Sequence, residues 1–510
     1  MKRSLSILGI LFSIFAGALN WSIVNMAAPS IQTSLNASLT NIQWLLNVFG
    51  LAMVPFLVLM GRLADVFGRK KVFLIGNLLF LIPSIFGGMA TSITGLIFWR
   101  GMQGFASAIV LPLSQALITK QFPENEHGRS IGFWMLTIGI GCGLGPLLGG
   151  VLISLFSWRM IFYFNIPFFL LSLILCGLFT NESKSEDGSR HLDFPGNITL
   201  IIFLTSLVYA IIEGPNAGWG STSIIVSFIV AVIFGIAFCY IELNTSNPII
   251  EFHLYLNERF LSASIGAFYT IFFVWSVFFL MPLYIQNILG FKPYETGLIL
   301  LLITAPFSIL SPIVGRLEQR FRPKYFIFLG ILFYTLFTTL CLFSKATISV
   351  WVLGGMLIAF GIGWSVLMGP CVSAGISSLP PSKTGLAAGS LNTIQEIGGG
   401  IGLAIIGSTL RNVGQNHVFE YIDTHNLNFT QRQLLEVRNQ LSNPQELLAY
   451  LRSEHIVVTD GLRKAIYDGF ITGMDAAMYI LLGLSALTFL LVLIFMRKPK
   501  EPVKDLKELL

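Results

Sequence analysis

The sequence predicts an all-α integral membrane protein with fourteen transmembrane helices. Of its 510 residues, 54% are hydrophobic and only 11% are charged, whereas a soluble chain carries roughly 25% charged residues. The apolar residues also come in blocks of about 20, the length with which a helix crosses a ~30 Å hydrocarbon core. Both observations point to a chain that passes through a membrane many times.

Each apolar block defines one expected span. The first block, "MKRSLSILGILFSIFAGAL", continues without a cleavage site into residues 21–28, so we interpret it as a retained span and not as a signal peptide. The expected spans are residues 5–26, 43–63, 72–91, 94–118, 130–154, 160–180, 195–213, 221–241, 261–283, 295–315, 325–344, 348–370, 385–410 and 470–496.

The distribution of Lys and Arg predicts the orientation. Connections on the side of the N-terminus are rich in basic residues, whereas the short loops on the other side hold only Arg159, Lys292 and Lys345. Basic residues concentrate in cytoplasmic loops, so both termini are expected in the cytoplasm. The net charge of +6 is explained by these loops and requires no nucleic-acid partner.

The one long outer loop, residues 411–469, carries helix signals of its own. Thr430 with Gln433 is typical of a capping box, and Asn443 followed by Pro444 is typical of a helix start. We expect a short amphipathic helical hairpin on the outer face, either a plain cover or a lid.

No residue pattern indicates a cofactor, a metal or an enzyme. The five cysteines all fall inside apolar blocks, the histidines lack metal-ligand spacing, and no phosphate-binding glycine loop is present. No nucleophile and base are paired in a catalytic pattern.

The connection between the second and third spans, "GRLADVFGRKKVFL", combines glycines, an acid and basic residues. Such a loop could simply anchor the topology, or it could form charge-assisted hydrogen bonds at the membrane surface. Its candidate residues for a conformational switch are Gly61, Asp65, Gly68, Arg69 and Lys70.

The fifth span contains a stripe of small residues, "GIGCGLGPLLGG". Gly141, Gly145 and Gly149 share one helix face, which lets a neighbouring helix approach closely. Pro146 removes a backbone donor and can kink the span, and Gly150 follows the stripe. All five residues are further candidates for the conformational switch. Plain small-residue packing would produce the same pattern.

Together these stretches resemble the major facilitator superfamily, and more narrowly its 14-helix drug:proton antiporter family. The 2–3 connection is similar to the superfamily's hallmark loop, "FWRGMQGFASA" to its fourth-span motif, and the glycine stripe to its antiporter motif. "SWRMIFYFNIP", "NPIIEFHLYLNERF" and "GLAAGSLNTIQEIGGGIGLAIIG" resemble the 14-helix family in order and spacing. One departure stands in the first span, where Asn20 occupies the place of the family's usual acid.

The resemblance implies two pseudo-symmetric six-helix bundles that rock around a central substrate site. They would be residues 1–180 and residues 261–496, the latter including the outer loop, with an inserted helix pair at 195–241 and a cytoplasmic tail at 497–510. It also implies a bacterial cytoplasmic (inner) membrane location.

Three ionisable span residues are candidates for proton coupling. Glu396 lies about eleven residues from the cytoplasmic end of its span, roughly 16 Å deep, where burial favours a neutral carboxyl group; a structural hydrogen bond is the alternative. Arg100 lies one turn inside its span, where it could instead be a surface anchor, and Asp475 lies near the outer end of the last span. Glu213, in the inserted pair, is expected to be solvated.

The candidates for the substrate cavity are polar or aromatic span residues: Asn20, Trp21, Asn25, Asn47, Gln103, Gln115, Asn392, Gln395 and Glu396. The leading hypothesis is a proton-coupled exporter of amphipathic, often cationic or aromatic drugs, with protons, a small molecule and the lipid bilayer as partners. The alternatives are a transporter for one physiological metabolite and, less favoured, a membrane sensor or scaffold that transports nothing. The sequence does not reveal whether a periplasmic adaptor is used.

Overall fold

The computed structural model describes residues 2–53, 56–122, 127–183, 193–245, 248, 252–318, 320–343, 348–376, 378, 384–441 and 443–495. In this part of the chain the regular structure is entirely helical. The helices are α1 (Lys2–Ser34), α2 (Leu39–Met53), α3 (Leu57–Phe67), α4 (Arg69–Met89), α5 (Ile93–Lys120), α6 (His127–Leu155), α7 (Met160–Tyr163), α8 (Asn165–Phe179), α9 (Phe194–Ala217), α10 (Thr222–Asn244), η3 (Phe252–Leu256), α11 (Glu258–Leu283), η4 (Tyr284–Ile288), α12 (Pro293–Leu317), α13 (Pro323–Leu342), α14 (Val350–Ile376), α15 (Thr384–Thr424), α16 (Gln431–Gln440), α17 (Pro444–Ser453) and α18 (Asp460–Phe495).

Twelve helical segments of the described chain are long and apolar enough to cross a membrane. The expected span 43–63 corresponds to two shorter helices, α2 and α3. The expected span 385–410 falls within α15, whose polar extension carries it to Thr424. The all-helical membrane class predicted from the sequence is therefore confirmed.

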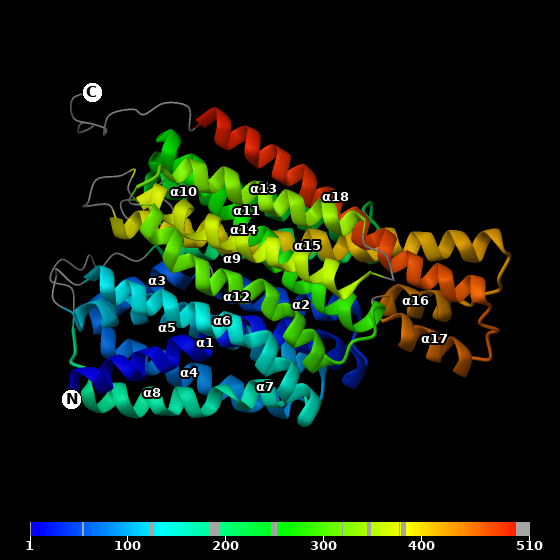
Figure 1. Cartoon of the computed structure of the whole chain (residues 1–510), viewed down its shortest axis with the longest axis horizontal. Helices are drawn as coiled ribbons and strands as arrows, with labels where there is room; N and C mark the ends of the chain where they lie inside the picture. The colour runs from blue at the N-terminus through cyan, green and yellow to red at the C-terminus, as the bar shows by residue number, and fades with distance from the viewer. Residues whose placement is uncertain are drawn as a thin grey trace.

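The long helices run roughly side by side along one axis (Figure 1). α1 begins and α18 ends at the same end of the molecule, called here the terminal end, and α16 and α17 lie at the opposite end, called the hairpin end. We call α1–α8 the N-terminal half and α11–α18 the C-terminal half. α9 and α10 pack on each other, and α9 also contacts α2 and α15.

The hairpin end extends beyond the bundle. α15 and α18 continue well past the other helices and carry α16 and α17 between them (Figure 1). The expected capping box is present, because the Thr430 backbone N–H donates to Gln433 Oε1 over 2.8 Å and the Gln433 N–H donates to Thr430 Oγ1 over 3.3 Å. Val418 and Leu462 pack with residues of both short helices in a separate apolar cluster. This cluster explains why α15 and α18 stay helical into the expected loop 411–469.

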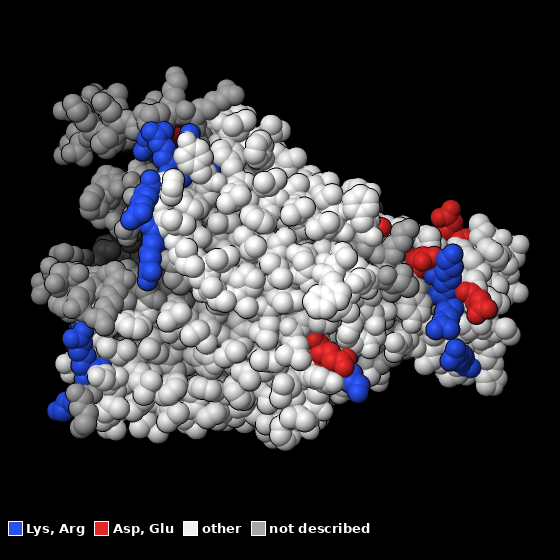
Figure 2. All heavy atoms as spheres, viewed as in Figure 1, with Lys and Arg blue, Asp and Glu red and all other residues white. Residues whose placement is uncertain are grey.

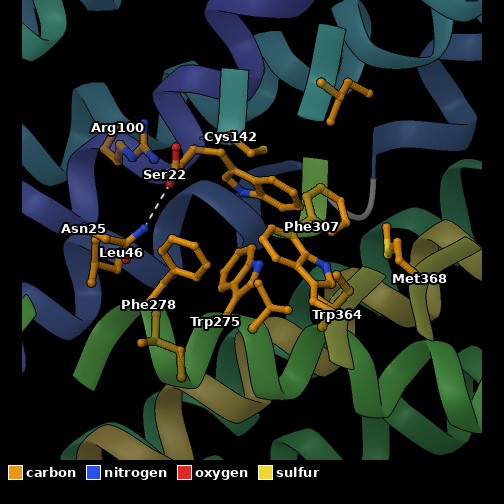
Figure 3. Close-up of a pocket in the computed structure, with 15 residues that line it drawn as sticks. Ser22, Asn25, Leu46, Arg100, Cys142, Trp275, Phe278, Phe307, Trp364 and Met368 are labelled. Atoms are coloured by element: carbon orange, nitrogen blue, oxygen red, sulfur yellow. Dashed lines mark hydrogen bonds between the residues drawn. The ribbon is translucent and has the colours of Figure 1, made fainter. Parts of the chain in front are cut away.

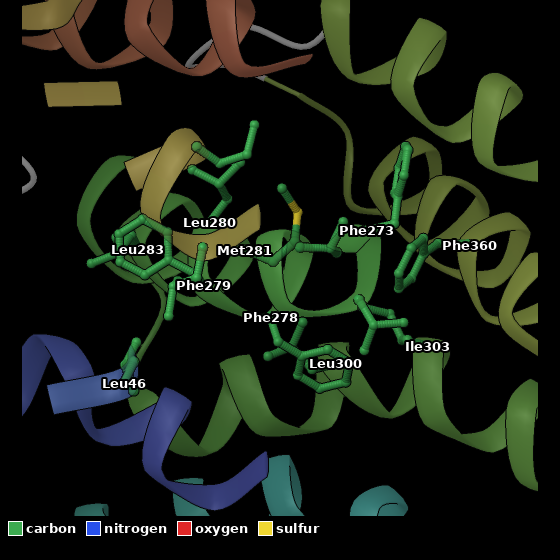
Figure 4. Close-up of a cluster of buried hydrophobic side chains, with 14 of the residues drawn as sticks. Leu46, Phe273, Phe278, Phe279, Leu280, Met281, Leu283, Leu300, Ile303 and Phe360 are labelled. Atoms are coloured by element: carbon green, nitrogen blue, oxygen red, sulfur yellow. The ribbon is translucent and has the colours of Figure 1, made fainter. Parts of the chain in front are cut away.

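The largest core surrounds α11, the most buried of the twelve candidate spans. Its apolar side chains contact α2, α12 and α14, as Leu46, Phe278, Leu300 and Phe360 illustrate in Figure 4. The core therefore runs from one half into the other without a break.

The surface has the pattern expected of a membrane protein. In Figure 2 the charged side chains gather toward the two ends, and a broad uncharged band lies between them. Large apolar side chains such as Leu178, Ile236 and Leu332 are exposed on this surface, where a bilayer would cover them.

Candidate functional site

A cavity of about 90 Å³ lies between the two halves. One wall comes from α1, α2, α5 and α6, and the other from α11, α12, α14 and α15 (Figure 3). The lining residues are Trp21, Ser22, Asn25, Leu46, Arg100, Ile138, Cys142, Ile271, Val274, Trp275, Phe278, Phe307, Trp364, Met368 and Leu403. The space is large enough for several water molecules but is smaller than the ~300–1,000 Å³ typical of drug-sized ligand pockets.

Aromatic rings from both halves dominate the wall. Trp21 on α1 meets Trp275 on α11 edge to face, with ring centroids 5.6 Å apart. Phe307 on α12 stacks on Trp364 of α14 at 3.8 Å. Such surfaces suit flat, apolar ligand rings, and tryptophan also attracts cations through its ring face.

Arg100 is the one charged side chain among the described lining residues. It is only 2% exposed, so it is not the surface anchor that its sequence position also allowed. Its guanidinium donates to the side chain of Asn20 and, over 3.0 Å, to Gln103 Oε1, and it lies 4.1 Å from the Phe49 ring centre. Arg100 is therefore held by neutral groups of its own half.

The other polar residues predicted for the cavity differ in their placement. Asn25 lines it and donates to the Trp21 carbonyl over 3.0 Å. Gln395 lies behind the wall, where its Nε2 donates to the sulfur of Met368 over 3.7 Å. Asn47 on α2 is buried against α15. Gln115 is half-buried and Asn392 is exposed. None of these three residues lines the cavity.

The predicted carboxylates are not part of the described wall. Asp475 on α18 is not among the lining residues and lies within electrostatic range of Tyr284 and Cys341. Glu396 belongs to α15 and Asp65 to α3, but their side chains lie outside the described residues.

The glycine stripe packs as its spacing predicts. A Cβ atom added at Gly141 would lie 2.8 Å from the Phe15 carbonyl oxygen, and one added at Gly149 would lie 2.9 Å from the Ile23 side chain, both on α1. A Cβ at Gly145 would overlap Ser22. The stripe therefore allows α1 and α6 to approach closely.

The end of the stripe contacts the other half instead. A Cβ atom at Gly150 would lie 2.8 Å from the Cα of Tyr294 on α12. The α6 backbone also accepts hydrogen bonds from Thr304 Oγ1 at Gly143 and from Ser308 Oγ at Gly139, over 3.0 and 3.1 Å. α6 thus joins the two halves.

The 2–3 connection is held by an acid that the sequence analysis did not single out. Glu182, just after α8, accepts the backbone N–H groups of Lys70 and Lys71 over 2.9 and 3.1 Å, and the Lys70 ammonium donates to the Gly177 carbonyl over 2.8 Å. Gly68 adopts φ +112° between α3 and α4, a conformation that favours glycine. A Cβ at Gly61 would meet nothing within 4 Å, so no close contact requires glycine there.

The sequence profile of the Major Facilitator Superfamily matches residues 10–403. The chain belongs to this superfamily. It is 36% identical over 402 residues to the multidrug resistance protein Stp of Mycobacterium tuberculosis, covering 78% of this chain and 74% of that protein. It is 30% identical over 415 residues to multidrug resistance protein 3 of Bacillus subtilis, covering 80% of each chain.

Solved structures share the fold. A bacterial homologue of the human lysosomal transporter Spinster, in its inward-facing and occupied conformation, superposes with a TM-score of 0.67 at 18% identity, covering 98% of this chain and 99% of that one. This superfamily member is therefore a multi-pass membrane transporter of small molecules and not an enzyme, and drug-resistance proteins are among its relatives.

Most of the aromatic wall escaped the sequence analysis. Trp275, Phe278, Phe307 and Trp364 lie in continuous apolar spans, where an aromatic residue facing a cavity has the same pattern as one facing a core or lipid. Tryptophan in mid-span was the available signal, since its N–H requires a partner that lipid does not offer.

Proposed function

We propose that this transporter is a proton-coupled exporter of amphipathic, often cationic or aromatic drugs that works by alternating access. The observation that carries the proposal is the aromatic cavity between the halves, whose walls both halves supply. The relatives named as multidrug resistance proteins support drugs as the substrates.

The contacts between the halves support a transport cycle with more than one state. Toward the hairpin end the halves touch closely, through Gly150 against α12 and through α2 against α15. The cavity enclosed here is smaller than a drug-sized ligand requires. Substrate entry and release would therefore need these contacts to part on one side at a time.

We further propose fourteen spans, in two pseudo-symmetric six-helix bundles with α9 and α10 inserted between them. In this arrangement α2 and α3 form one span and α15 provides another. The terminal end would face the cytoplasm of a bacterium and the hairpin end the outside, as the basic connections favour.

Proton coupling is proposed for Glu396, assisted by Arg100 and Asp475. A carboxylate at mid-membrane costs about 2.5–3.5 kcal/mol on insertion scales, so the neutral form is favoured and a proton can be taken up from one side and released on the other. The 2–3 connection and the α6 glycines would serve as the moving contacts.

The test is drug accumulation inside inverted vesicles, whose lumen corresponds to the outside of the cell, with a pH-sensitive dye enclosed. We expect Glu396→Gln to abolish uphill efflux and substrate-induced proton movement, because a neutral amide cannot cycle a proton, while Asp475→Asn reduces both by less. Full efflux and full proton movement in Glu396→Gln would exclude Glu396 as the coupling site.

The second candidate, a transporter for one metabolite, is favoured by the charge of the described cavity wall, where Arg100 is the only charged residue. Broad export of cations would be expected to use acids there. A panel of unrelated dyes separates the two: efflux of several of them, abolished by an uncoupler, supports the drug exporter, and efflux of none supports the specific transporter.

A further inference from the structure

The inserted helix α9 bridges the two halves near the hairpin end. On one side, Glu213 Oε1 accepts the indole N–H of Trp44 on α2 over 3.2 Å. On the other side, the carbonyl of Ile211 accepts the hydroxyl of Ser408 on α15 over 2.7 Å. Glu213 is thus half-buried and bonded, in contrast to the solvated residue that the sequence suggested.

Arg411 joins all three helices at one point. It lies on α15, is 1% exposed, and donates both to the hydroxyl of Thr40 on α2 and to the carbonyl of Ile212 on α9. Glu213 interacts with it electrostatically. A buried guanidinium is costly to leave without partners, so these bonds hold the three helices together.

Apolar contacts reinforce the junction. Val208 and Ile212 of α9 form one cluster with Ala404 of α15, and Trp44 of α2 packs against it. The ring centroids of Trp44 and Tyr209 lie 6.3 Å apart. Apolar side chains therefore lie beside the buried guanidinium of Arg411, where a low local dielectric strengthens its hydrogen bonds.

Two unsatisfied amide side chains lie beside the junction. Gln43 and Asn47, one turn apart on α2, are fully buried. Both polar atoms of each side chain lack a hydrogen-bond partner in the described part of the chain. A Cβ at Gly407 of α15 would overlap the Gln43 amide, and one at Gly400 would lie 3.9 Å from Asn47 Oδ1. Burying unpaired amides is unfavourable, so this α2–α15 seam gains hydrogen bonds to water when it opens.

We infer that α9 is the outer clamp of this transporter, because it bonds to α2 on one side and to α15 on the other. Glu213 accepts from Trp44 of α2, and the carbonyls of Ile211 and Ile212 accept from Ser408 and Arg411 of α15. Arg411 also donates directly to Thr40 of α2. The clamp keeps the seam closed against the hydration of Gln43 and Asn47. When it releases, both amides line the exit path and offer hydrogen bonds to the leaving substrate. The inference rests on the proposed alternating access, with the hairpin end as the outer side.

Closure of the α2–α15 seam can be measured by the formation of an engineered disulfide between the two helices. The Cγ of Gln43, whose place a cysteine sulfur would take, lies 3.0 Å from a Cβ built at Gly407, a spacing that suits a disulfide. The Gln43→Cys, Gly407→Cys pair also removes the Gln43 amide, with which a Cβ atom at position 407 would overlap. The rate at which it cross-links in membranes under mild oxidant then measures the closed fraction.

The clamp is tested by adding Glu213→Gln, Trp44→Phe or both to this pair. Glu213→Gln removes the charge facing Arg411, and Trp44→Phe removes the indole donor while keeping a ring beside Tyr209. We expect each to lower the ratio of closed to open seam by about threefold to tenfold, the range of one interhelical hydrogen bond in a membrane protein, and to slow cross-linking accordingly. Thr205→Ala, at an exposed position on the same helix, is the matched control and should leave the rate unchanged.

Equal cross-linking rates in the parent pair and both clamp variants would overturn the inference, as would an equal slowing by Thr205→Ala. Efflux is measured separately in the variants that retain Gln43 and Gly407. If the clamp variants slow cross-linking but the protein exports no drug, the proposed function is wrong and the clamp inference is retained. If drugs are exported but the clamp variants leave the cross-linking rate unchanged, only the clamp inference is wrong.

Discussion

In the described part of this transporter two arginines are buried between helices, and they differ in which helices they bind. Arg100 and Arg411 are 2% and 1% exposed, and both donate to neutral oxygen atoms. The partners of Arg100 lie on α1 and on its own helix α5, all within the N-terminal half. The partners of Arg411 lie on α2 and α9, across the boundary from its own helix α15.

The difference indicates what each arginine does in a rocking transporter. The bonds of Arg100 can persist while the halves move, because nothing in them crosses the boundary. The bonds of Arg411 cannot all persist if α2 and α15 separate. One arginine therefore stabilises a half, and the other stabilises one arrangement of the two halves.

The largest effect that would test this comparison is on folding. Arg100→Gln removes the donor that pairs with Asn20 and Gln103 and leaves their oxygen atoms buried without it, at a cost on the order of 3 kcal/mol. We expect a clear drop in the thermal unfolding temperature in detergent. In protein that remains folded, the cross-linking rate of the Gln43→Cys, Gly407→Cys pair should be unchanged. A faster or slower cross-link at unchanged stability would contradict a role within one half.

A smaller loss of stability and a larger change of conformation are expected for Arg411→Gln. The shorter amide gives up the bonds to Thr40 and Ile212, while the packing of α15 on α11 and α18 remains. Cross-linking of the seam should slow by about tenfold or more, since at least two interhelical bonds are lost. If this variant unfolds as readily as Arg100→Gln and cross-links normally when folded, the contrast between the two arginines is wrong.

The glycines of α6 offer the same contrast at a smaller scale. Gly150→Ala places a methyl group against the α12 backbone across the boundary, whereas Gly141→Ala places one against α1 within a half. We expect Gly150→Ala to slow seam cross-linking by about fivefold, the equivalent of the ~1 kcal/mol at the lower end of overpacking costs, and Gly141→Ala to lower the unfolding temperature instead. If both variants changed the cross-linking rate and the unfolding temperature by the same amounts, contacts across the boundary would not differ from contacts within a half.

Several local features could be predicted because their causes lie within a few residues of one another. The expected positions of the spans follow from the length of apolar blocks, and the capping box at Thr430 from hydrogen bonds three residues apart. The close face of Gly141, Gly145 and Gly149 follows from the helical repeat. The family itself was identified from such short motifs, and the profile match over residues 10–403 confirms it.

The membrane class, the superfamily and the closely packed faces of single helices thus follow from the amino-acid sequence alone. Which polar residues meet depends on the packing of distant helices, because Arg411 and Thr40 are 371 positions apart and Trp44 and Glu213 are 169 apart. That packing also decided that the cavity wall is aromatic, since apolar spans look alike whether they face lipid, core or cavity. Hydrophobic length and helical period act locally along the chain, whereas the pairing of a buried charge depends on which distant helix arrives beside it.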